Sequence, residues 1–107
     1  MISIIPSEFF KREFDDLFKK FRNIAKDVDI IVQELKTNPR VGKSLGNNCY
    51  KIRVKNSDIN KGKSGGYRII TYIIRDDKIY LLAIYSKTEK MTISDQEISN
   101  RIKSLSN

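Results

Sequence analysis

Hydrophobic residues in the first forty positions follow a short strand and then helical spacing. Residues 2–5 are rich in isoleucine and end at Pro6, which predicts an edge strand, because proline cannot donate to a sheet ladder. A helix capped by Ser7 follows, and its apolar positions recur at steps of three and four along one face: Phe10, Phe14, Leu17, Phe21 and Ile24. A turn near residues 23–27 and a second helix that stops before Pro39 would complete an αα-hairpin.

Beyond residue 40 the hydrophobic period changes to the two-residue alternation of a β-strand. Residues 49–55 alternate strictly, so three apolar side chains face one side and three cations face the other: Tyr50, Ile52, Val54 and Lys51, Arg53, Lys55. Residues 67–74 and 79–85 are mostly apolar on both faces, which is typical of covered central strands. The expected connections are a polar loop at 56–66 and a hairpin turn at 75–78, and a short strand near 40–45 is also expected.

Residues 94–97, Ser-Asp-Gln-Glu, have the form of a capping box, which predicts a short C-terminal helix. Ile98, Ile102 and Leu105 would be buried by that helix. The order of strand, two helices, three or four strands and a helix indicates an α+β fold. We expect a single domain over residues 1–107. The N-terminal strand and the αα-hairpin would pack on a mostly antiparallel sheet of four to five strands, with the helices on one face.

The composition excludes several kinds of site. The chain has no histidine, which excludes a His-based catalyst, a Ser-His-Asp triad and His metal ligands. The single cysteine, Cys49, excludes an internal disulfide, fits a reducing compartment and argues against a zinc site. No apolar run approaches the roughly 18 residues that span a bilayer, and the N-terminus lacks a basic signal-peptide region. We therefore expect a cytoplasmic protein without a membrane partner.

Positive charge is concentrated in the middle of the chain. The net charge is +8, and residues 41–90 contain eleven Lys or Arg against four Asp or Glu. One interpretation is the solvated surface of a basic protein, covered by long charged side chains. The other is an interface for a polyanion, which the density of charge between Lys43 and Arg68 favours. Nucleic acid is therefore the expected partner.

Arg68 interrupts an apolar strand, where a charge needs a carboxylate or an external anion as its partner. Since acidic residues are scarce in this half of the chain, a phosphate is the better candidate. Two Gly-Lys-Ser triplets, at 42–44 and 62–64, lack the glycine that a Walker A loop requires five positions earlier. No paired carboxylates lie at catalytic spacing, so we expect neither a metal ion nor another cofactor.

These residue types can cut RNA without histidine or a metal ion. The 2′-hydroxyl of RNA can attack the adjacent phosphate while protein cations stabilise the developing charge. A lysine crowded by other cations has a lowered pKa and can act as a base. Arginine cannot act as a base, but it holds a phosphate through two parallel hydrogen bonds. Tyrosine offers a hydroxyl group and a ring on which a base stacks.

Three stretches together resemble the RelE/ParE toxin superfamily, most closely its HigB-like branch: Cys-Tyr-Lys-Ile-Arg-Val at 49–54, Gly-Lys-Ser-Gly-Gly-Tyr-Arg-Ile-Ile-Thr-Tyr at 62–72, and Ile-Tyr-Leu-Leu-Ala-Ile-Tyr-Ser-Lys-Thr-Glu-Lys at 79–90. The similarity extends over nearly the whole chain. It implies a RelE-like fold and a toxin of a toxin–antitoxin pair. Such toxins bind the ribosome, cleave mRNA in the decoding site and are silenced by a cognate antitoxin.

The resemblance also implies roles for individual residues. Lys51 and Arg53 match the basic strand positions of the family, and Arg68 matches its Gly-Tyr-Arg arginine. Lys51 would be the base, Arg53 would stabilise the phosphate, and Arg68 would clamp it or help the leaving group. Tyr85 and Lys87 would line the same cleft. Further contacts with RNA are expected from four lysines: Lys43, Lys55, Lys61 and Lys63.

The sequence departs from the RelE pattern in two places. Thr88 stands where an arginine is expected, and no aromatic residue follows Tyr85 in place of the C-terminal catalytic tyrosine. Tyr85 or Lys87 would then substitute, or the activity would be weak. Two alternatives to an endoribonuclease stay open, a ParE-like toxin that inhibits DNA gyrase by binding and a non-catalytic RNA-binding module. The oligomeric state does not follow from the sequence.

Overall fold

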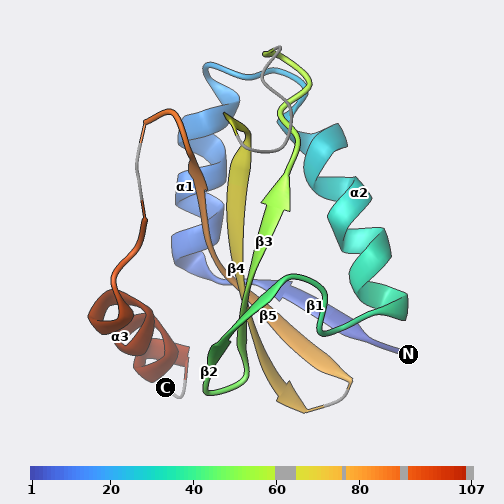
Figure 1. Cartoon of the computed structure of the whole chain (residues 1–107), viewed down its shortest axis with the longest axis vertical. Helices are drawn as coiled ribbons and strands as arrows, with labels where there is room; N and C mark the ends of the chain where they lie inside the picture. The colour runs from blue at the N-terminus through green and yellow to red at the C-terminus, as the bar shows by residue number, and fades with distance from the viewer. Residues whose placement is uncertain (60–64, 76, 90–91, 106–107) are drawn as a thin grey trace.

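A five-stranded sheet with helices on both faces forms the centre of the molecule (Figure 1). The computed structural model describes residues 1–59, 65–75, 77–89 and 92–105. The elements are β1 (Ser3–Pro6), α1 (Glu8–Phe18), α2 (Ile24–Thr37), β2 (Lys43–Gly46), β3 (Cys49–Val54), β4 (Tyr67–Arg75), β5 (Lys78–Ser86) and α3 (Asp95–Leu105). The sheet order is β1-β5-β4-β3-β2, with β1 parallel to β5 and the other neighbours antiparallel. The α+β fold is therefore confirmed, and β2 is the expected short strand.

α1 and α2 cover one face of the sheet and build the larger part of the core. Ser7 caps α1 as predicted, because its Oγ accepts a hydrogen bond from the backbone N–H of Phe10 at 3.1 Å. Each buried aliphatic or aromatic side chain in this layer contributes about 1.5–3 kcal/mol relative to its exposed state. The helices bury Phe10, Leu17, Ile24, Val28, Ile31 and Leu35 against strand residues that include Ile52, Val54, Tyr67 and Ile69.

The turn between α1 and α2 lies at residues 19–23, earlier than the predicted 23–27. Phe21 belongs to this turn rather than to the first helix, and Ile24 begins α2. Phe21 still reaches the core, where its ring packs edge-on against Tyr67 with the ring centroids 5.9 Å apart. This tertiary contact explains why the spacing of Phe21 imitates a helical position.

α3 packs on the opposite face of the sheet, which corrects the expectation that the helices lie on one face (Figure 1). The predicted capping box is present, because the backbone N–H of Glu97 donates to Ser94 Oγ at 3.1 Å. No helix in the described part of the chain is long and apolar enough to cross a membrane. The second hydrophobic cluster, beneath α3, contains Cys49, Ile70, Leu82, Ala83, Tyr85, Ile93 and Ile98. The apolar runs of β4 and β5 are thus explained by helical layers on both faces.

A bulge in β5 changes which of its residues face the α3 side of the sheet. Leu81 and Ala83 pair with consecutive residues of β4, so Leu82 is an extra residue without a partner in the register. A period of two shifts by one position at such a bulge. Tyr85 therefore joins the cluster beneath α3, and Lys87 follows on the same side as the cations of β3 and β4.

Candidate nucleic-acid interface

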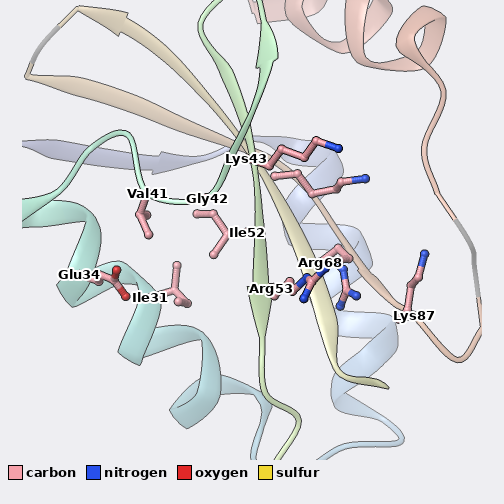
Figure 2. A pocket seen from close by; sticks show the side chains of 10 residues that line it. Ile31, Glu34, Val41, Gly42, Lys43, Ile52, Arg53, Arg68 and Lys87 are labelled. Carbon is pink, nitrogen blue, oxygen red and sulfur yellow. The ribbon is translucent and has the colours of Figure 1, made fainter. Parts of the chain in front are cut away.

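Strand register brings the predicted cations together on the α3 side of the sheet. Lys43 of β2 pairs with Lys51 of β3, and Arg53 of β3 pairs with Arg68 of β4. Residues directly opposite each other on antiparallel strands point to the same side of the sheet, so these four cations share one face. Lys87, directly after β5, joins them (Figure 2).

These five cations line one pocket of about 580 Å³, which we call the basic pocket (Figure 2). Its remaining lining comes from α2, from the segment between α2 and β2, and from β3: Ile31, Glu34, Val41, Gly42 and Ile52. Among the described residues that line it, Glu34 carries the only carboxylate. Pockets for small organic ligands measure about 300–1,000 Å³, so the basic pocket has room for a nucleotide.

Gly42 brings the wall of the basic pocket close to β3. Its φ is +101°, in the region that favours glycine. A Cβ atom at this position would lie 2.5 Å from the backbone oxygen of Lys51, so a side chain would also force the two segments apart. The Gly-Lys-Ser triplet at 42–44 therefore lines the basic pocket and begins β2, and it does not form a phosphate-binding loop.

Lys51 lies half-buried among the other cations of the basic pocket. Burial lowers the pKa of its ammonium group below the ordinary value, and four neighbouring charges lower it further: Lys87, Lys43, Arg68 and Arg53. The environment expected for a crowded lysine is therefore present. Because of this lowered pKa, the side chain of Lys51 becomes neutral at a lower pH than the side chain of an exposed lysine does.

Arg68 is only 6% exposed and lies in the sheet between Arg53 and Tyr85. Its Nη1 donates a hydrogen bond to the backbone oxygen of Tyr67 at 3.2 Å. Burial and the charge of Arg53 lower the pKa of the guanidinium group, and Tyr85 acts in the opposite sense. Because a guanidinium nevertheless stays charged in proteins, a second cation directly opposite makes this position favourable for an anion.

The two residues expected at the end of β5 are placed differently. Lys87 lines the basic pocket, and its backbone N–H donates to the oxygen of Gly66 at 2.9 Å. Tyr85 is 6% exposed, pairs with Arg68 in the register and lines a separate hollow beside Glu13. Its pairing with Arg68 favours contact with that arginine, and the role expected for Tyr85 in the cleft stays a prediction.

Of the four lysines expected to contact RNA, the structure describes Lys43 and Lys55, which lie in different hollows. Lys43 lies in the basic pocket with the strand cations. Lys55 follows β3 and lines a neighbouring hollow along α2, which shares Ile31, Glu34 and Arg53 with the basic pocket. Lys61 and Lys63 lie outside the described residues.

The sequence patterns do not indicate the α2 side of the basic pocket. Ile31 belongs to the hydrophobic core and Glu34 is exposed on α2, yet both line the pocket together with Val41. Their three-residue spacing places Ile31 and Glu34 on neighbouring turns of one helical face. This spacing is the sequence signal that could have placed the two residues together. It does not indicate which strand this face of α2 packs against.

The described residues contain no group of three or more Cys, Asp or Glu side chains that could hold a metal ion. Cys49 is 2% exposed, and burial raises the pKa of its thiol, so it is a core residue rather than a reactive one. The charged side chains that a ligand would meet in the basic pocket are its five cations and Glu34. Such a set can bind a phosphate and supply a lysine of lowered pKa.

Known proteins match both the sequence and the fold. The family model of the RelE toxin of the RelE/RelB toxin–antitoxin system matches residues 9–107. A double mutant of the E. coli toxin RelE in the free state is similar in structure, with a TM-score of 0.62, 19% identity and 96% of each chain covered. The intact E. coli RelBE toxin–antitoxin complex gives a TM-score of 0.60 and 19% identity, covering 80% of this chain and 96% of that chain. The structures show the shared fold, and from the family match the chain belongs to the RelE toxin family.

Proposed function

We propose that the protein is a metal-independent, ribosome-dependent endoribonuclease that cleaves mRNA and so inhibits translation. As a member of the RelE family it is a toxin of a toxin–antitoxin system. The observation that carries the proposal is the basic pocket, where Lys51, with its lowered pKa, lies beside Arg53 and Arg68. This arrangement combines a base with phosphate-binding groups, as cleavage by the 2′-hydroxyl requires.

In the proposed reaction the 2′-oxygen of RNA attacks the adjacent phosphorus, and the bond from phosphorus to the 5′-oxygen of the next nucleotide breaks. The products are a 2′,3′-cyclic phosphate and a 5′-hydroxyl. Neutral Lys51 takes the proton of the 2′-hydroxyl, which its lowered pKa favours. The Lys87 ammonium group gives a proton to the leaving 5′-oxygen, in place of the missing C-terminal tyrosine.

The arginines of the basic pocket bind the phosphate in this mechanism. Arg53 and Arg68 stabilise the charge that develops on the phosphate oxygens, and a single donor of this kind is worth about 10²–10³ in rate. Tyr85 acts as a positioning residue, because it is buried next to Arg68. The RNA strand continues over the four lysines proposed to contact its backbone: Lys43, Lys55, Lys61 and Lys63.

The proposed partners are the ribosome with its mRNA and a cognate antitoxin. The similar RelBE structure is a toxin–antitoxin complex. A net charge of +8 suits both the phosphates of ribosomal RNA and an acidic segment of an antitoxin. The resemblance to the HigB-like branch stays a prediction.

Inducible expression followed by mapping of the ends of ribosome-bound RNA tests the function. We expect new RNA ends within coding sequences for the wild type and a loss of about 10²- to 10⁴-fold for Lys51→Ala and Arg68→Ala. Lys36→Ala is the matched control, because Lys36 is exposed on α2 outside the basic pocket, and it should cleave like the wild type. Full cleavage by a folded Arg68→Ala variant contradicts the proposal.

Two other results would select an alternative function. DNA breaks without new mRNA ends would indicate inhibition of gyrase. Salt-sensitive RNA binding without cleavage, even on translating ribosomes, would indicate a non-catalytic RNA-binding module. Because Arg68 is buried, circular dichroism and thermal unfolding of each variant are needed to separate lost chemistry from lost folding.

A further inference from the structure

The basic pocket has two chemically different sides. Figure 2 shows Arg68 and Lys87 on one side of β3, and Ile31 and Glu34 of α2 on the other. The first side is cationic, whereas the second combines apolar side chains with one carboxylate. A ligand that fills the whole pocket must therefore be anionic at one end, and at the other end it must be apolar and carry hydrogen-bond donors.

A nucleotide is divided in the same way. Its phosphate is anionic, whereas its base has apolar faces and an edge of hydrogen-bonding groups. Proteins recognise single-stranded RNA by packing side chains on the faces of its bases and by forming hydrogen bonds with their edges. With phosphate on the arginines, the base would pass over the edge of β3 beyond its pairing with β2, towards Ile31, Val41 and Glu34.

Glu34 supplies the hydrogen-bonding group at this end of the pocket. Its side chain is exposed and takes part in no ion pair or hydrogen bond among the described residues, so it can bind a ligand without losing an existing contact. Ile31, one turn earlier on α2, provides apolar contact beside it. An ionised carboxylate accepts hydrogen bonds through two oxygens and donates none.

We infer that the basic pocket holds a whole nucleotide of the RNA substrate and that Glu34 selects guanine, an inference that rests on the proposed function. Guanine presents N1–H and N2–H donors side by side, which match the two oxygens of a carboxylate in a bidentate pair. Adenine and cytosine present one amino group next to an acceptor nitrogen. Uracil presents a single N–H between two carbonyl oxygens, which a carboxylate repels.

Titration of the isolated protein with the four nucleoside 3′-monophosphates, followed by NMR, tests this selection. We expect guanosine 3′-monophosphate to bind about 5- to 100-fold more tightly than the uridine nucleotide, the discrimination of one bidentate pair. Glu34→Gln should bring this ratio towards one, because its amide offers one acceptor and one donor. Asp29→Asn removes the same charge from an exposed position of α2 outside the pocket, and it should keep the ratio.

The ratio of affinities is the decisive readout, because loss of a negative charge strengthens the binding of every anion. Equal binding of all four nucleotides, a ratio that survives Glu34→Gln, or the absence of saturable binding overturns the inference. None of these results affects the cleavage proposal, which depends on Lys51 and Arg68. Conversely, guanine selection that is lost in Glu34→Gln supports the inference even where mapped RNA ends show no cleavage.

Discussion

At the scale of single residues, Lys51 lies in surroundings that favour its neutral form. Burial is the largest cause of its lowered pKa, and among the neighbouring charges Lys87 lowers the pKa most. An ordinary lysine has a pKa near 10.4 and is almost wholly protonated at neutral pH. Because the folded pKa lies below the unfolded one, Lys51 costs stability at low pH, and this cost disappears as the pH rises through the two values.

Replacing Lys87 by glutamine should raise the pKa of Lys51 towards its ordinary value, because the neighbouring charge that lowers this pKa most is removed. The ¹³Cε chemical shift of Lys51, followed by NMR across the titration, measures the pKa directly and does not depend on catalysis. Lys36→Gln, exposed on α2 outside the basic pocket, should leave the titration unchanged. The same Lys51 titration in the Lys87→Gln variant and the wild type would contradict the assigned cause.

At the scale of secondary-structure elements, the pairing of β3 with β4 sets two like charges directly opposite each other. Arg53 is exposed, whereas Arg68 is 6% exposed. Such cross-strand pairs of like charge are destabilising, so this pair lowers the stability of the protein without a bound anion. An anion bound between the arginines would relieve the repulsion.

Arg53→Gln should therefore raise the free energy of unfolding by about 0.2–1 kcal/mol, the range for one cross-strand pair, while it weakens phosphate binding. Urea unfolding with and without inorganic phosphate measures both effects. Phosphate should stabilise the wild type more than the variant. Arg40→Gln, exposed between α2 and β2, serves as the control for net charge. An equal change of stability in both variants would contradict a specific repulsion between Arg53 and Arg68.

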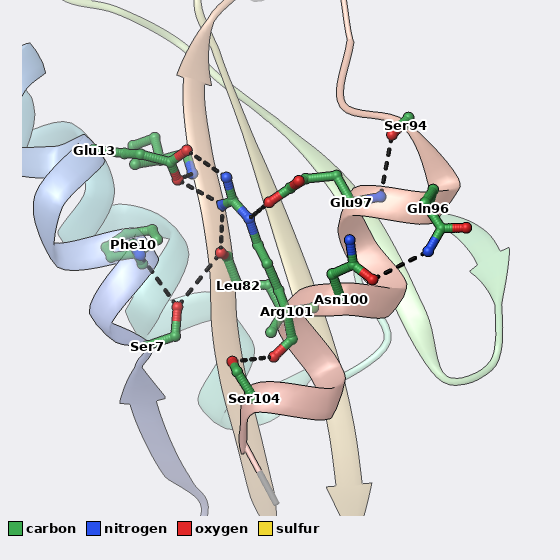
Figure 3. A network of polar contacts seen from close by, with 11 residues as sticks. Ser7, Phe10, Glu13, Leu82, Ser94, Gln96, Glu97, Asn100, Arg101 and Ser104 are labelled. Atoms are coloured by element: carbon green, nitrogen blue, oxygen red, sulfur yellow. Dashed lines mark hydrogen bonds and ion pairs between the residues drawn. The ribbon is translucent and has the colours of Figure 1, made fainter. Parts of the chain in front are cut away.

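At the scale of the whole molecule, one ion-pair network joins the helical layers of the two sheet faces (Figure 3). Arg101 of α3 donates to both carboxylate oxygens of Glu13 of α1, each at 2.9 Å, and to the backbone oxygen of Leu82 at 2.9 Å. Glu13 also accepts from the backbone N–H of Ile84 at 3.2 Å. Hydrogen bonds to Glu13 and to Glu97 raise the pKa of Arg101, although burial acts to lower it.

Glu13→Ala should lower the free energy of unfolding by about 2 kcal/mol. This is less than the about 3–5 kcal/mol for breaking a fully buried pair, because the Glu13 side chain is 27% exposed and Glu97 still pairs with Arg101. Chemical denaturation measures the change. Asp16→Ala on the same helix removes only an exposed pair with Lys19 and should change stability by less than about 0.5 kcal/mol. Similar losses in the two variants would mean that Arg101 does not hold α3 in place.

Much of the secondary structure could be predicted from local patterns, because helix caps and periodicity depend on neighbouring residues. Ser7 and Ser94 cap α1 and α3 as expected. The position of the turn after α1 could not be predicted, because Phe21 keeps helical spacing while it packs from the turn against Tyr67. The placement of α3 on the second face also required the tertiary structure, because an amphipathic helix does not specify which apolar surface it covers.

By itself, the sequence determined the α+β fold and the alternating cations of β3, which place Lys51 and Arg53 on one face, because side-chain direction along a strand depends only on the two-residue period. Only the tertiary structure decided the rest of the basic pocket. The bulge at Leu82 placed Tyr85 and Lys87 on the α3 side, and packing brought Glu34 of α2 beside β3. Register shifts and contacts between distant segments arise from packing in three dimensions, so no local pattern records them.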